Sequence, residues 1–165
     1  MRPQARTLLV SCLVAGASTG MAGAVDVSFV NRQSYADAGT STWDEDTNLQ
    51  VLARHLQNLG LRYLPADQVL RIEVLDVDLA GTVHPSRRGG DLRVVRGKAD
   101  FPRLHLKYAI EAGGKVQRTG DEWLSDLTYT GGPPSSYRDQ PLYYEKRMID
   151  AWFKARFLQG PASAG

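Results

Sequence analysis

Cysteine is almost absent from this sequence. Among 165 residues there is one, Cys12, and it lies in an N-terminal segment that we expect to be removed. A chain without cysteine can form no disulfide, and it has no thiol nucleophile, thiolate metal ligand or redox pair. We therefore expect packing alone to hold the fold together.

Short catalytic signatures are absent as well. The sequence contains no G-x-S-x-G, S-x-x-K, H-E-x-x-H, P-loop or G-x-G-x-x-G motif. Its histidines, His55, His84 and His105, do not have the spacing of metal ligands. We expect His55 to lie away from the leucine stripe of its helix and His105 to lie on the solvent side of a strand. We therefore predict no catalytic residue, no cofactor and no metal site.

Long apolar runs are also missing. The longest one, Leu8 to Ala17, is too short to cross a membrane, which takes about 20 residues. Arg2 and Arg6 precede it, and the small-x-small sequence Ala22-Gly23-Ala24 follows it, as in a signal peptide with its cleavage site. We predict that residues 1–24 are a cleavable signal peptide and that the protein is exported to the periplasm of a Gram-negative bacterium. Secretion is the alternative, and a lipoprotein is not expected.

An excess of charge of one sign is missing too. The full chain has 20 basic and 18 acidic residues, and loss of the two leader arginines leaves 18 of each. A mature chain near neutrality has no overall attraction for a phosphate backbone. We therefore predict no nucleic-acid partner.

Periodicity predicts several strands. Apolar residues alternate with polar ones over 25–30 and again over 103–111, which predicts strands with one buried face. Gly113-Gly114 then predicts a hairpin whose second strand runs to about Tyr129.

The richest β-forming stretch is Val69 to Ala80. Its buried side changes near Val74, because Leu70 and Ile72 alternate in one phase and Val77 and Leu79 in the other. A change of phase of this kind predicts a β-bulge.

Two amphipathic helices are predicted. The first begins at a capping box formed by Thr42 and Glu45 and ends at Gly60. The second begins at Pro141, a residue suited to the first turn of a helix. Both carry apolar residues at helical spacing, and we expect these stripes to form the core. The stripe of the second helix consists of Tyr144, Met148, Ile149, Trp152, Phe153 and Phe157.

The order of elements is strand, helix, strand, strand, hairpin, helix, with a loop over 81–90 and a short strand over 92–96. This order predicts an α+β fold, in which two amphipathic helices pack against a mostly antiparallel sheet of four to five strands. We predict one domain over residues 25–158 and a flexible tail over residues 159–165.

Five motifs resemble a known family. They are Trp43-Asp44, I-E-V-L-D-V-D-L-A-G from Ile72, G-D-L-R-V-V-R-G from Gly90, E-W-L-S-D from Glu122 and Y-E-K-R-M-I-D-A-W-F from Tyr144. The family comprises exported proteobacterial proteins and is known as domain of unknown function number three thousand and sixteen. The resemblance covers nearly all of the chain after the leader. It implies a single domain in a Gram-negative envelope and no particular activity, cofactor or catalytic residue.

Asp76 and Asp78 form the acidic pair that most clearly suggests a site. Residues two apart on a strand point to the same side, so the two carboxylates could share a cation or act as an acid and a base. Asp126 could join them if the hairpin brings it near. The alternative is that the carboxylates reach solvent or pair with arginine.

A basic cluster follows the central strand. Residues 87–103 hold six basic side chains and two acidic ones. The guanidinium fork matches phosphate and carboxylate, which predicts an anion-binding loop. The alternative is a solvated face with weak ion pairs. The arginines assigned to the loop are Arg87, Arg88, Arg93 and Arg96.

The connection before the second helix is rich in tyrosine. Aromatic residues favour interfaces but also pin loops to cores. We assign Tyr129, Tyr137 and Tyr143 to a contact surface.

Three functions are consistent with these features. The leading one is a non-catalytic binding or accessory module of the envelope that binds an unidentified, anionic component through the arginine loop. The second is a carboxylate- or metal-dependent hydrolase of an envelope polymer, with Asp76, Asp78 and Asp126 in its site. The third is a structural subunit of an envelope complex.

Overall fold

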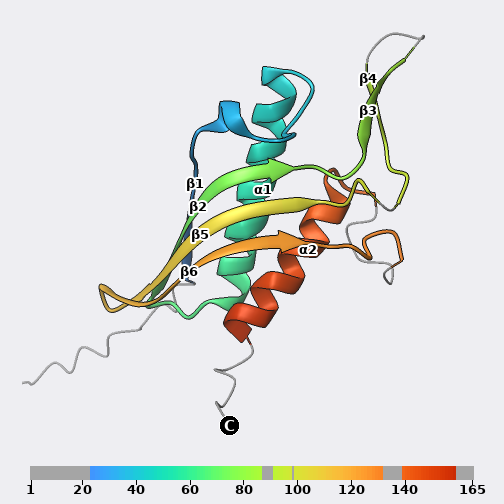
Figure 1. Cartoon of the computed structure of the whole chain (residues 1–165). Coiled ribbons are helices and arrows are strands. Elements are labelled where there is room, and N and C mark those ends of the chain that lie inside the picture. The colour runs from blue at the N-terminus through green and yellow to red at the C-terminus, as the bar shows by residue number, and fades with distance from the viewer. Residues whose placement is uncertain (1–22, 87–90, 98, 132–138, 159–165) are drawn as a thin grey trace, which may run out of the picture.

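A computed structural model describes residues 23–86, 91–97, 99–131 and 139–158 (Figure 1). The predicted signal peptide and the predicted tail lie outside these ranges, apart from Gly23 and Ala24. Two parallel strands, β1 (Ala24–Phe29) and β2 (Gln68–Asp78), begin the fold, and helix α1 (Thr42–Tyr63) connects them. Parallel neighbours need a crossover of this kind because a tight turn can join only antiparallel strands.

Helix α1 differs from the prediction at both ends. Its N-cap is Ser41, one residue before the expected Thr42, and the Ser41 hydroxyl accepts a hydrogen bond from the Asp44 N–H at 3.2 Å. The helix continues past Gly60 to Tyr63. Gly60 serves close packing instead, since a Cβ there would lie 2.2 Å from Cγ2 of Val25 on β1.

The β-bulge in β2 is confirmed. The pairing of β2 with β5 (Arg103–Ala112) shifts register between Val74 and Asp76. Before the shift the buried residues include Ile72 and Val74, and after it Val77 is buried. The bulge therefore lets both halves of one strand contribute to the same core.

The predicted hairpin is also confirmed. Strand β5 turns at Gly113 and Gly114, whose φ angles are 56° and 73°, into β6 (Lys115–Ser125). Strand β6 ends earlier than predicted, because the carboxylate of Asp126 accepts a hydrogen bond from the Thr128 N–H at 3.0 Å and turns the chain.

The main sheet has the strand order β1-β2-β5-β6. Its first pair is parallel and its other two pairs are antiparallel, so the sheet is mixed and mostly antiparallel. The segment expected to be a loop between β2 and β5 contains a strand instead. This strand, β3 (Thr82–Pro85), pairs with β4 (Asp91–Val94), and together they form an arm that projects from one end of the main sheet (Figure 1).

Helix α2 (Tyr143–Phe153) closes the structure and continues into a π-helical turn (Lys154–Leu158). The helix begins two residues later than predicted, because Leu142 takes a left-handed conformation with φ of 56° and serves as its N-cap. Both helices pack on one face of the sheet, and no helix or strand of the described residues covers the other, which we call the open face (Figure 1). No helix among the described residues has the length and apolar character needed to span a membrane.

Candidate functional site

One end of the molecule collects most of the residues that the sequence singles out. The carboxyl ends of β1 and β2, the first turns of both helices and the base of the arm all lie there (Figure 1). We call this region the arm end. Its side chains are joined by hydrogen bonds and ion pairs between segments that are far apart in the sequence.

The three candidate acids have separate partners. Asp76 accepts hydrogen bonds from the backbone N–H groups of Ala36 and Val77, at 2.8 and 2.9 Å. Asp78 accepts one from Arg103 Nε at 3.0 Å. Within the described part of the chain, no group of three or more histidine, cysteine or acidic residues is placed to hold a metal ion.

Asp126, the third candidate, lies on the turn after β6. Its carboxylate pairs with Arg147 of α2, with 2.6 Å between Oδ2 and Nη2. The bonds to Arg147 and Thr128 outweigh partial burial and lower the pKa of Asp126. Asp126 therefore connects the turn to α2.

Arg93, one of the predicted anion-binding arginines, pairs with a carboxylate. Its two terminal nitrogens donate to the two carboxylate oxygens of Asp37 at 2.8 and 3.0 Å, and Nη1 also donates to the Gly81 carbonyl at 3.3 Å. The side chains of Arg93 and Asp37 are about one quarter exposed. This bidentate pair ties the arm to the loop after β1.

Near Arg96, backbone N–H groups donate hydrogen bonds to the Asp100 carboxylate. The N–H groups of Arg96 and Gly97 donate to Asp100 at 2.9 and 3.0 Å, and the Tyr129 hydroxyl donates to Asp100 Oδ1 at 2.6 Å. These bonds lower the pKa of Asp100 to about 2. Burial and Asp100 raise the pKa of Tyr129 to about 12. Tyr129 is only 1% exposed, so its ring packs inside the protein, against Tyr144.

The remaining predicted residues lie close by or outside the described ranges. Tyr143 is at the start of α2, and its ring lies next to the ring of Tyr144 and the guanidinium of Arg147. Arg87, Arg88 and Tyr137 lie outside the described residues. The assignment of the arginine loop and the tyrosine surface as binding regions therefore stays a prediction.

Glu145 is a buried carboxylate at the arm end that the sequence analysis missed. It is 5% exposed and accepts a hydrogen bond from the Ala80 N–H at 2.7 Å. Burial raises the pKa of Glu145, and nearby Asp37 acts in the same direction, whereas the hydrogen bond from Ala80 and the charge of Arg93 oppose the shift. Glu145 precedes Met148 on α2, and its carboxylate lies against the segment that follows β2.

We expect this burial to make stability depend on pH. Because the pKa of Glu145 is higher in the folded protein than in the unfolded chain, the folded state retains a proton that the unfolded chain releases. The free energy of unfolding should therefore fall as pH rises from about 4.5 through the folded pKa. Glu145→Gln should remove this fall, which urea titrations at a series of pH values would measure.

The matched control is Glu73→Gln, because Glu73 is exposed on the open face of the sheet. It should keep the pH dependence of the wild type. Equal slopes in wild type and Glu145→Gln would contradict this explanation.

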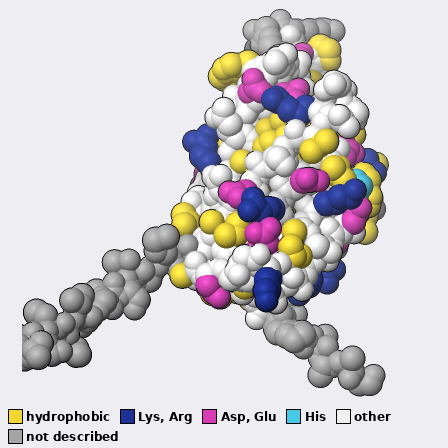
Figure 2. All heavy atoms as spheres, turned by 90° about the vertical axis from the view of Figure 1, so that its left-hand side faces the viewer, with side chains coloured by type: hydrophobic (Ala, Val, Ile, Leu, Met, Phe, Trp, Pro, Cys, Tyr) yellow, Lys and Arg dark blue, Asp and Glu magenta, His cyan; other side chains and the backbone are white. Residues whose placement is uncertain are grey.

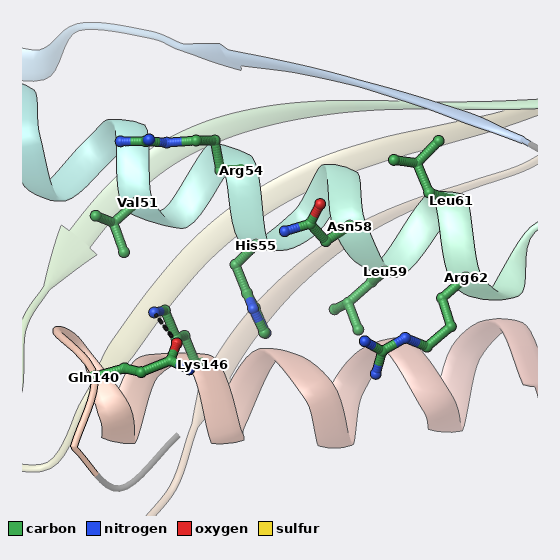
Figure 3. A pocket seen from close by; sticks show the side chains of 9 residues that line it. All are labelled: Val51, Arg54, His55, Asn58, Leu59, Leu61, Arg62, Gln140 and Lys146. Atoms are coloured by element: carbon green, nitrogen blue, oxygen red, sulfur yellow. Dashed lines mark hydrogen bonds between the residues drawn. The ribbon is translucent and has the colours of Figure 1, made fainter. Parts of the chain in front are cut away.

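A groove of about 760 Å³ lies between α1 and α2 (Figure 3). His55 and Arg62 extend from α1 toward α2, and Arg54 lies along the outer side of α1 (Figure 3). Lys146 reaches into the groove from α2 and donates to Gln140 Oε1 at 3.1 Å. The described lining includes three cationic side chains and no acidic one: Val51, Arg54, His55, Asn58, Leu59, Leu61, Arg62, Gln140 and Lys146.

His55 was misplaced by the sequence analysis. It is 7% exposed, and its Nε2 lies 2.7 Å from Oδ1 of Asp150 on α2. The expectation that it would point away from the leucine stripe was wrong, because the second helix covers the flank of that stripe. Its position directly before Leu56 was the one available signal. By contrast, His105 does lie on the open face, stacked on Trp123.

Lys146 is a basic residue in a buried position. The residue is only 7% exposed. Burial lowers the pKa of Lys146, the charge of Arg54 lowers it further, and Glu145 opposes both. Positive charges are therefore crowded at this end of the groove, and an anion placed there would relieve their repulsion.

The fold and the groove together define a class, namely a small α+β domain with a cationic groove between its two helices. The sequence matches the model of the family described as a protein of unknown function, DUF3016, over residues 23–155. The chain therefore belongs to this family, as its motifs indicated. No curated protein matches the sequence.

Proposed function

We propose that this protein is a non-catalytic binding module of the bacterial envelope that holds an anionic ligand in the groove between α1 and α2. The observation that carries the proposal is the lining of the groove, which among the described residues includes the basic side chains of Arg54, Arg62 and Lys146 and no acidic one. The polar groups Asn58 and Gln140 add hydrogen-bonding capacity.

The spacing of the charges indicates the shape of the ligand. Arg62 extends from α1 toward α2, and Lys146 enters the groove from α2. Figure 3 shows Lys146 near one end of the groove and Arg62 near the other. An elongated anion with two separated phosphate or carboxylate groups would contact both ends. We therefore expect such a ligand to bind more tightly than a single phosphate.

The leader supports the envelope setting. The family match begins at residue 23, next to the predicted cleavage site after Ala24. An exported protein meets anionic lipids and phosphorylated polymers in the envelope, and both present phosphate groups. One face of the molecule, shown in Figure 2, mixes acidic and basic side chains of the described residues without a block of one sign.

The test measures binding of two anionic probes that represent the two sources of phosphate. Inorganic tripolyphosphate represents a soluble polyanion, and calorimetry measures its binding. Vesicles of phosphatidylglycerol represent a membrane, and co-sedimentation measures their binding. Phosphatidylcholine vesicles are the neutral reference. We expect tripolyphosphate binding that weakens with salt. The double variant Arg62→Gln, Lys146→Met should bind roughly a hundredfold more weakly, at about tenfold for each charge-assisted contact.

Arg71→Gln is the control, because it removes one positive charge from the open face of the sheet, away from the groove. Its affinity should stay within about twofold of the wild type, a change of under 0.5 kcal/mol. Equal loss in the control would show non-specific attraction, and the absence of binding to either probe would overturn the proposal. Vesicle binding alone would identify a lipid headgroup as the ligand.

A further inference from the structure

Strand β6 leaves one edge of the sheet open. The main sheet ends with β6, and among the described residues no strand pairs with its outer edge. β6 is eleven residues long, whereas the strand at the opposite edge, β1, has six. A long free edge exposes a row of backbone donors and acceptors that can pair with another strand.

Exposed apolar side chains gather on the same strand. Seven large apolar side chains are exposed among the described residues, and three of them, Val116, Trp123 and Leu127, lie on β6 or two residues after it. Trp123 is 61% exposed, on the open face of the sheet. Such side chains at a free edge indicate a surface that another molecule covers.

The sequence of β6 is complementary to itself in one register. Antiparallel pairing of two copies around a two-fold axis at Gly120 places Arg118 of each copy opposite Glu122 of the other and Thr119 opposite Asp121. An axis at Asp121 would place two aspartates opposite each other, and an axis at Glu122 two glutamates. Of these three axes, only the one at Gly120 places opposite charges across from each other and avoids a like-charged pair.

The side chains of this register are already held on the correct side. Glu122 accepts hydrogen bonds from Trp152 Nε1 at 3.1 Å and from Arg156 Nε at 2.9 Å, which keeps it on the helix-covered face. The Arg118 side chain lies on that face too, where Nη2 donates to the Arg156 carbonyl. Because a carboxylate can accept about four hydrogen bonds, Glu122 can also pair with Arg118 of a second copy.

We propose that two copies of this chain associate through their β6 strands to form one continuous eight-stranded sheet. The two-fold axis passes through Gly120, which has no side chain to keep the strands apart. The regular pairing around this axis covers Arg118 to Glu122, because a bulge next to Ile110 interrupts the strand on the hairpin side. A contact of this size gives a weak and reversible dimer. The proposal is independent of the groove and its ligand.

Cysteine cross-linking tests both the dimer and its register. In a Cys12→Ser background, the double variant Thr119→Cys, Asp121→Cys places each new cysteine opposite one on the second copy. Opposite Cα atoms in an antiparallel pair lie about 4.5–5.5 Å apart, within the range that a disulfide spans. Both positions are exposed in the monomer, so the fold should tolerate the change. We expect mild oxidation to produce a covalent dimer of twice the 18.2 kDa chain mass.

Two controls separate this register from random collision. Thr119→Cys alone faces Asp121 and should form no covalent dimer. The pair Asp26→Cys, Ser28→Cys has the same spacing on the exposed side of β1 and should form no covalent dimer either. Sedimentation equilibrium of the wild type should show a mass that rises with concentration. A wild type that is monomeric at all concentrations, or equal cross-linking in the controls, would overturn the proposal.

Discussion

Replacement of Phe153 by alanine is expected to lower the free energy of unfolding by about 3–5 kcal/mol. Phe153 is fully buried, at 0% exposure, and its ring packs against Tyr63, Trp152 and Phe157. The change removes apolar area from the core and leaves a cavity that three neighbouring rings cannot easily fill. Urea denaturation followed by circular dichroism would measure the loss.

Trp43→Ala is the matched control for this prediction. Trp43 is an even larger aromatic residue, but it is 77% exposed at the start of α1. Its removal should change the free energy of unfolding by less than about 0.5 kcal/mol. Similar losses in both variants would mean that the aromatic cluster around Phe153 does not form the centre of the core.

Replacement of Arg93 by alanine is expected to lower the free energy of unfolding by about 2 kcal/mol. This loss is smaller than the loss expected when a fully buried ion pair is broken, because about a quarter of the Arg93 and Asp37 side chains is in contact with water. The change leaves the Asp37 carboxylate half-buried without its two hydrogen bonds and leaves the Gly81 carbonyl without its donor. The arm should also lose its connection to the loop after β1. Hydrogen exchange in β3 and β4 should therefore become faster.

Arg71→Ala is the matched control, because it also breaks an arginine–carboxylate pair. Arg71 also pairs with carboxylates, those of Glu111 and Asp26, but its side chain is 57% exposed. Water screens an exposed pair of this type, so it contributes little to stability. The prediction fails if Arg71→Ala destabilises the protein as much as Arg93→Ala does, because burial would then not determine the strength of the pair.

Local patterns predicted the elements of this fold well. The hairpin at Gly113-Gly114 and the bulge near Val74 depend on neighbouring residues only, and both are confirmed. Element ends were less accurate, because tertiary contacts moved them. Gly60 lies inside helix α1, where it leaves room for Val25, and the chain from Thr82 to Pro85 becomes a strand because β4 pairs with it.

The candidate site was harder to predict. The residues chosen from the sequence, such as Asp76 and Arg93, do gather at the arm end, but folding gives each of them a separate partner there. Apart from His55, the groove residues were not singled out. Nothing in the local sequence of Lys146 indicates that two helices meet there.

The sequence by itself determined the α+β class, the order of the main strands and helices and the membership of the DUF3016 family, because periodicity, turns and motifs are properties of neighbouring residues. Only the tertiary structure decided which charges meet. His55 and Asp150 are 95 positions apart, Glu145 and Ala80 are 65 apart, and Arg93 and Asp37 are 56 apart. Contacts over such separations depend on how whole elements pack, and so does the cationic groove between the two helices.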